Sequence, residues 1–118
     1  MSPRKKVLFV CDANRLRSPT AIELYQHNED LEVKSAGISR EIAIRVTSEL
    51  LEWADIIFVF EKRHRNLIHK EFNGLYWRKS ITCLYVPDLY DYMDPDLIYI
   101  LKQRLKRYIG PAKCFNER

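Results

Sequence analysis

Four short runs of apolar, β-prone residues, separated by segments with helical spacing, constrain the fold of this chain more than any other feature. Most of these runs are continuously apolar, which is typical of strands that are covered on both faces. Strands that alternate with helices are joined by right-handed crossovers, so the pattern predicts a parallel sheet between helices. Strands are expected at residues 6–11, 32–36, 55–60 and 81–86, and helices at 19–28, 47–54, 62–72 and about 95–108.

The length of 118 residues indicates one domain, expected over residues 1–110, with a C-terminal tail at 111–118. The last predicted helix has leucines at i, i+4 and i+8, and Asp94 before Pro95 is expected to cap its start. The apolar runs are too short to cross a bilayer, and no charged-then-apolar leader opens the chain. We therefore expect a cytoplasmic protein with no membrane partner.

Charge and cysteine usage argue against several classes of function. The net charge is +4, but basic residues are mostly interleaved with acidic ones, so nucleic-acid binding is not expected. The three cysteines are far apart in the sequence and no histidine lies near them, which argues against a disulfide framework and against a zinc site. No metal or cofactor is predicted. The pattern assigns His64 and His69 to the solvated surface, because residues five apart do not share a helix face.

Cys11 stands where the first predicted strand ends and a helix follows. The chain between them must turn at a helix N-terminus, where backbone N–H groups and the helix dipole favour an anion. A thiolate in such a cradle would be stabilised by the same field and would be ready as a nucleophile. Arg17 adds a planar fork for two phosphoryl oxygens, and Ser18 adds a hydroxyl that can donate to the sulfur.

The stretch "VLFVCDANRLRSPTA" at 7–21 resembles the signature of the low-molecular-weight protein tyrosine phosphatases, Cys-x-Gly-Asn-x-x-Arg-Ser-Pro-x-Ala, directly after the first strand. The "SAG" at 35–37 is similar to the next landmark of that family. The resemblance implies an α/β fold with a four-stranded parallel sheet and helices on both faces, a flavodoxin-like three-layer sandwich. It also implies hydrolysis of aryl phosphate monoesters, protein phosphotyrosine in particular, through a phosphocysteine intermediate.

The resemblance assigns a role to each matching residue. Cys11 would be the nucleophile, Arg17 the phosphate clamp, Ser18 the hydrogen-bonding partner of the thiolate, and Asn14 the residue that holds the loop in shape. The residues expected to bind phosphate or line the cleft are Asp12, Ala13, Asn14, Arg15, Leu16, Arg17, Ser18 and Tyr90.

The chain departs from the family pattern at Ala13, which stands in place of glycine, and at Leu16, which replaces a second cysteine that many members carry. The segment between Gly37 and the third strand is also shorter than in the family, so a shallower or differently walled pocket is expected.

The segment after the fourth strand offers three candidates for the general acid. Asp88, followed by Tyr90, is favoured by its distance from the strand, whereas Asp94 before Pro95 matches the family dipeptide literally but also serves as a helix cap. Asp91 remains an alternative. Two other functions stay open: a non-catalytic module that binds an oxyanion or a phosphoprotein, and arsenate reduction. The latter is disfavoured because it needs reactive cysteines near Cys11.

Overall fold

The predicted α/β fold is confirmed by the computed structural model, which describes residues 4–12, 16–39 and 45–110. Its four strands form one sheet in the order β2-β1-β3-β4, and every neighbouring pair is parallel. The predicted tail at 111–118 lies outside the described residues, and the single domain over 1–110 stays a prediction. The strands are β1 (Lys5–Cys11), β2 (Leu31–Gly37), β3 (Ile56–Val59) and β4 (Ile81–Cys83).

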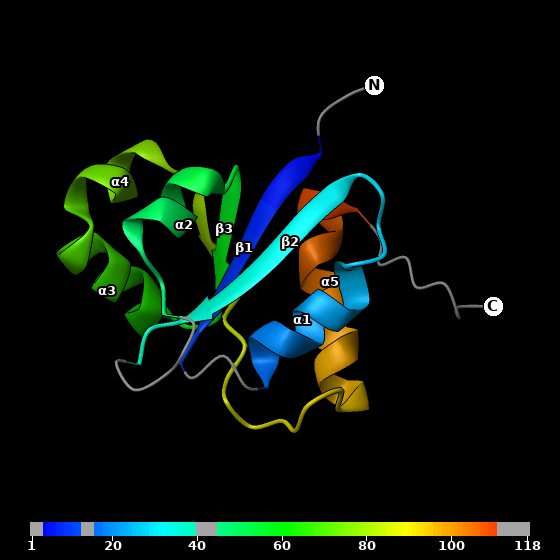
Figure 1. Cartoon of the computed structure of the whole chain (residues 1–118). Coiled ribbons are helices and arrows are strands. Elements are labelled where there is room, and N and C mark those ends of the chain that lie inside the picture. Colours follow the sequence, from blue (N-terminus) through cyan, green and yellow to red (C-terminus); the bar gives the residue numbers. More distant parts are fainter. Residues whose placement is uncertain (1–3, 13–15, 40–44, 111–118) are drawn as a thin grey trace.

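Helices cover both faces of the sheet, as Figure 1 shows. Two helices, α1 (Arg17–Tyr25) and α5 (Pro95–Ile109), pack on one face. Three helices pack on the other: α2 (Ser48–Trp53), α3 (Lys62–Glu71) and α4 (Asn73–Arg78). The sequence pattern missed α4, which follows α3 directly. None of the described helices is long and apolar enough to cross a membrane.

The central strand β1 supplies both halves of the core, because successive side chains of a strand point to opposite faces. Phe9 and Cys11 belong to the core beneath α1 and α5, whereas Leu8 and Val10 belong to the core beneath the other three helices. All four of these side chains are buried. The apolar run of β1 is therefore continuous because both faces of the strand are covered.

The end of β1 lies at the point where the order of the strands in the sheet reverses. From β1 the chain goes first to β2 on one side and then to β3 on the other side. The helices that connect these strands therefore leave on opposite faces, which opens a crevice beyond the carboxyl ends of β1 and β3. Cys11 ends β1, and Phe60 and Glu61 directly follow β3.

The edge strand β4 is shorter than the predicted 81–86. Backbone pairing with the β3 segment continues beyond Cys83, since Leu84 N–H donates to Val59 O and Val86 N–H donates to Phe60 O, each at 2.8 Å. Between them Tyr85 has a φ of 56°, in the left-handed region, so the chain bends there and the regular strand stops.

Asp94 caps α5 as the sequence predicts. Its side chain accepts a hydrogen bond from Asp96 N–H at 2.8 Å, with Pro95 in the first turn. We expect Asp94→Ala to lower the free energy of unfolding by about 1 kcal/mol, because a helix N–H loses its acceptor. Asp94→Asn should keep most of this free energy. Urea denaturation measures both variants, and equal losses for Ala and Asn would contradict the capping role.

Candidate active site

Cys11 and Ser18 flank the loop that connects β1 to α1. Both side chains are buried, Cys11 at the end of the strand and Ser18 in the first turn of the helix. The Ser18 hydroxyl has no hydrogen-bond partner among the described residues, although buried hydroxyls are nearly always paired. It is therefore free to donate to a thiolate or to a bound anion. Ala13, Asn14 and Arg15, which the sequence placed in the phosphate site, lie outside the described residues.

The helix α1 begins at Arg17 with Leu16 as its N-cap, and no side chain caps it. The Leu16 carbonyl accepts hydrogen bonds from the backbone N–H and the hydroxyl of Thr20. The first turn of α1 is therefore hydrogen-bonded as in a regular helix, immediately after Leu16. An uncapped first turn leaves backbone N–H groups for an anion.

Arg17 is the most buried charged side chain at this edge of the sheet, with 2% of its surface exposed. Its Nη1 donates to a Glu61 carboxylate oxygen at 2.5 Å and to the Val86 carbonyl at 2.8 Å. Its Nη2 lies 3.3 Å from an Asp12 carboxylate oxygen. The guanidinium thus joins the ends of three neighbouring strands of the sheet.

Two N–H donors of the Arg17 guanidinium form no hydrogen bond to a described residue. A guanidinium of arginine has five N–H donors, of which the bonds to Glu61 and Val86 use both on Nη1 and the bond to Asp12 uses one on Nη2. The remaining donors are the second Nη2–H and the Nε–H, which lies 3.9 Å from Asp88 Oδ1, beyond hydrogen-bonding distance. Such a pair of donors matches two oxygens of a phosphate or carboxylate.

Of the three candidates for the general acid, only Asp88 lies beside Arg17. Its Oδ1 is 3.9 Å from Arg17 Nε, and its side chain is 53% exposed. Asp94 is occupied as the cap of α5, and Asp91 is exposed and pairs through its carbonyl with Asp94 N–H. Tyr90 is half-buried against the core beneath α1 and α5. The geometry therefore favours the same candidate that the strand position favoured.

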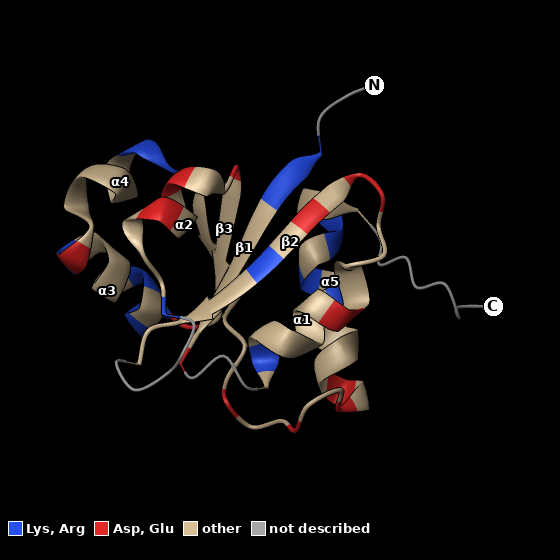
Figure 2. Ribbon diagram, in the orientation of Figure 1, with Lys and Arg blue, Asp and Glu red and all other residues tan. Residues whose placement is uncertain are grey.

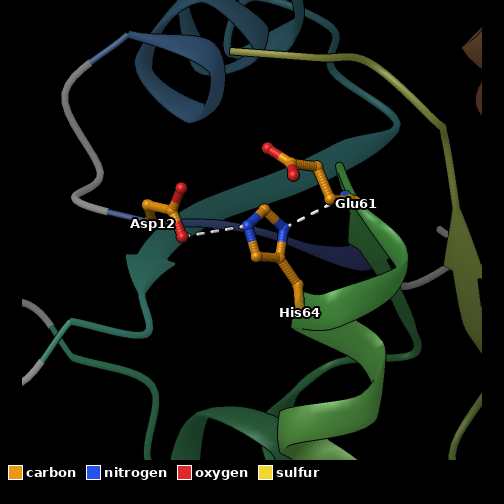
Figure 3. Close-up of side chains that lie close together, drawn as sticks. All are labelled: Asp12, Glu61 and His64. Carbon is orange, nitrogen blue, oxygen red and sulfur yellow. Dashed lines mark hydrogen bonds and ion pairs between the residues drawn. The ribbon is translucent and has the colours of Figure 1, made fainter.

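The surface assignment of His64 is wrong, because the side chain is fully buried. Its Nδ1 accepts hydrogen bonds from the backbone N–H groups of Phe60 and Glu61, at 3.3 and 3.1 Å. Its Nε2 lies 3.2 Å from an Asp12 carboxylate oxygen, and Figure 3 shows the ring between Asp12 and Glu61. The three-residue spacing of Glu61 and His64 at a helix start, typical of a capping box, is the sequence signal that could have found it.

Arg17 and Arg63 keep the carboxylates of Asp12 and Glu61 ionised. Partial burial, the largest influence, would raise the pKa of Asp12, but the hydrogen bond from Arg63 and the nearby charges together lower it below its ordinary value. Burial likewise opposes ionisation of Glu61, and hydrogen bonds from Arg17 and Arg63 lower its pKa overall. The hydrogen bond to Asp12 raises the pKa of Arg63. Both carboxylates are therefore charged throughout the neutral range.

Asp12, Glu61 and His64 are also the one group among the described residues whose spacing could suit a metal ion, since their ligand atoms lie within 4.8 Å of one another. The hydrogen bonds to His64 argue against this use. Because Nδ1 accepts from two backbone N–H groups, the proton of the neutral ring is on Nε2, which then has no lone pair for a metal. The arginines already neutralise the two carboxylates, so the cluster serves as an ion-pair network.

Comparison with known proteins identifies the same fold in several phosphatases. No protein-family model and no curated protein sequence matches the chain. Among solved structures, the tyrosine phosphatase Wzb from Escherichia coli K30 in complex with sulphate has a TM-score of 0.72 at 19% identity, covering 90% of this chain and 96% of that one. The low-molecular-weight protein tyrosine phosphatase SP-PTP from Streptococcus pyogenes has a TM-score of 0.71 at 17% identity, covering 90% and 94%.

A third neighbour, the YwlE arginine phosphatase from Geobacillus stearothermophilus, has a TM-score of 0.66 at 20% identity, covering 87% of this chain and 91% of that one. At these identities the likeness shows the fold. The fold that the signature at Cys11 implied is thus confirmed.

The burial of His64 predicts a dependence of stability on pH. Burial, as the largest influence, lowers the pKa of His64 below its ordinary value, although Asp12 opposes this shift. The unfolded chain therefore binds a proton below a pH of about 6.5 that the folded chain does not bind, and stability is lost as the pH falls. The groups that face the ring are Asp12, Arg17, Arg63 and Glu61.

Urea denaturation of the wild type should therefore give a lower free energy of unfolding at pH 5.5 than at pH 7.5. In His64→Asn this difference should shrink, while the variant should be less stable at pH 7.5 by about 1–3 kcal/mol because buried donors lose their acceptor. The matched control is His27→Asn, which removes an exposed histidine and should retain the pH dependence. An unchanged pH dependence in His64→Asn would contradict this account.

Proposed function

We propose that the chain is a cysteine-dependent phosphatase that hydrolyses aryl phosphate monoesters, protein phosphotyrosine in particular. The observation that carries the proposal is the buried guanidinium of Arg17, which Glu61 and the Val86 carbonyl hold near the end of β1 and which keeps two N–H donors without a hydrogen bond to a described residue. An oxyanion bound there would lie at the helix N-terminus and near the unpaired hydroxyl of Ser18. The cytoplasmic location stays a prediction from the sequence.

The first chemical step transfers the phosphoryl group to the protein. The Cys11 thiolate attacks phosphorus, a P–S bond forms, and the P–O bond to the leaving group breaks. Asp88 gives its proton to the leaving oxygen, so that a phenol rather than a phenolate departs. Arg17 holds two non-bridging oxygens throughout and stabilises the charge that they carry in the transition state.

The second step releases phosphate. The Asp88 carboxylate takes a proton from water, the oxygen attacks phosphorus, and the P–S bond breaks to regenerate the thiolate. Ser18 donates to the sulfur as its negative charge returns. Every step uses residues of this chain and water alone.

Turnover separates a phosphatase from a module that only binds phosphorylated ligands. We expect a burst of p-nitrophenol from p-nitrophenyl phosphate, followed by steady release, because the first step frees the phenol and the slower hydrolysis of the covalent intermediate then limits turnover. Folded protein that binds phosphate without releasing phenol would instead support the binding module. Peptides with phosphotyrosine and with phosphoarginine should be compared next, since one structural neighbour is named an arginine phosphatase. Faster hydrolysis of phosphoarginine would overturn the substrate class.

The nucleophile is tested by Cys11→Ser, which should abolish turnover because an alcohol is not ionised near neutral pH. Phosphate binding, measured by calorimetry, should persist in this variant. Cys83→Ser is the matched control: Cys83 is a free, half-buried thiol in β4, and its loss should leave kcat within about twofold. Turnover that survives in Cys11→Ser would contradict the mechanism.

The general acid is tested by the dependence of rate on the leaving group. Asp88→Asn should slow hydrolysis of phenyl phosphate on the order of a hundredfold and of p-nitrophenyl phosphate far less, because the poorer leaving group needs the proton more. Asp91→Asn is the control, an exposed aspartate three residues away, and should change neither rate appreciably. A leaving-group-dependent loss in Asp91→Asn, but not in Asp88→Asn, would show that the assignment is wrong.

A further inference from the structure

A hollow outside the candidate active site lies between the chain that follows β4 and the C-terminal half of α5. Its volume is about 470 Å³, which falls in the range of pockets that hold small molecules. Polar and apolar groups both line it, so a ligand there would meet charged donors and aromatic rings together. The lining residues are Cys83, Leu84, Tyr85, Gln103, Arg104, Arg107 and Tyr108.

Two guanidinium groups at this hollow have unused donors. Arg107 is exposed and lies over the Tyr108 ring, 5.8 Å from its centroid, and no carboxylate among the described residues forms an ion pair with it. Arg104 donates from Nη1 to the carbonyls of Leu84 and Tyr85, the latter at 2.6 Å. The Nε and Nη2 groups of Arg104 donate to none of the described residues, so this edge is open to a ligand.

The helix that forms one wall of the hollow is basic in its C-terminal half. The C-terminal half of α5 carries Lys102, Arg104, Lys106 and Arg107, and no Asp or Glu occurs from residue 97 to residue 110. Figure 2 shows the basic residues along this half of α5 and the acidic ones at its start. Positive charge along this half of the helix favours an anionic ligand.

The other wall of the hollow is held in an uncommon conformation. Tyr85 has a φ of 56°, and the hydrogen bond from Arg104 to its carbonyl fixes the backbone there. A bulky residue in this region is strained, and such strain concentrates at binding sites. The bend leaves the side chain of Tyr85 59% exposed at the hollow instead of packed in the core.

We propose that this hollow binds a small organic anion. The Arg104 and Arg107 guanidiniums would bind its carboxylate or phosphate, and its apolar body would lie against the rings of Tyr85 and Tyr108. Arginine matches both oxyanions through paired N–H donors, and tyrosine rings offer apolar surface at low entropic cost. The proposal does not depend on the phosphatase activity.

The test is a titration of the isotope-labelled full chain, followed by NMR of its backbone amides. Benzoate and phenylphosphonate are added in separate arms, which distinguish a carboxylate ligand from a phosphate-like one. At least one probe should give saturable shifts at residues 84–85 and 103–108. Signals at the start of α1 report binding at the candidate active site separately.

Arg107→Gln should weaken binding at the hollow about tenfold or more, because a charge-assisted contact is lost. Lys106→Gln is the matched control: it removes the same charge from the neighbouring residue, which does not line the hollow, and should change the affinity less than threefold. Both side chains are exposed, so both variants should fold and keep the backbone amide NMR spectrum of the wild type away from the substituted residue. The proposal is overturned if neither probe shifts the hollow, or if Lys106→Gln weakens binding as much as Arg107→Gln.

Discussion

The buried guanidinium of Arg17 is the interaction on which the organisation of this site depends. A charge at 2% exposure is costly unless it is paired and hydrogen-bonded. Here Asp12 after β1, Glu61 after β3 and the Val86 carbonyl after β4 supply the partners. The same contacts leave two N–H donors of the guanidinium without a hydrogen bond to a described residue, and Asp88 lies 3.9 Å from one of them, the Nε–H. The contacts that stabilise the buried guanidinium of Arg17 therefore also position it to bind an oxyanion.

The sheet makes this convergence possible. Parallel strands deliver their carboxyl ends to one edge, and the reversal of strand order between β1 and β3 keeps helices from covering it. Residues far apart in the sequence, such as Asp12 and His64, meet there because the strands before them are neighbours. His64 in turn uses the backbone N–H groups after β3 to fix its ring, which orients Asp12. A network of local hydrogen bonds thus positions the groups around Arg17.

The sequence predicted the fold class and most element positions, because periodicity and a local signature determine these; the roles assigned to Cys11, Arg17 and Ser18 stay predictions. It did not predict α4, which is too short to show a helical repeat. It assigned His64 to the surface because helical spacing alone does not show that Asp12, directly after β1, lies against the start of α3. The role of Glu61 was missed for a related reason: a partner for Arg17 that is 44 residues away can be found only once the strands are paired.

The account makes Cys11 the residue that carries the phosphoryl group between the two steps. The most direct test is to mix the protein with a labelled aryl phosphate, quench the reaction with acid within milliseconds, and locate the phosphoryl group by mass spectrometry. The account predicts one phosphate per chain, attached to Cys11 and absent when Cys11→Ser replaces the wild type. A phosphoryl group on any other residue, or phenol release with no trapped intermediate, would contradict it.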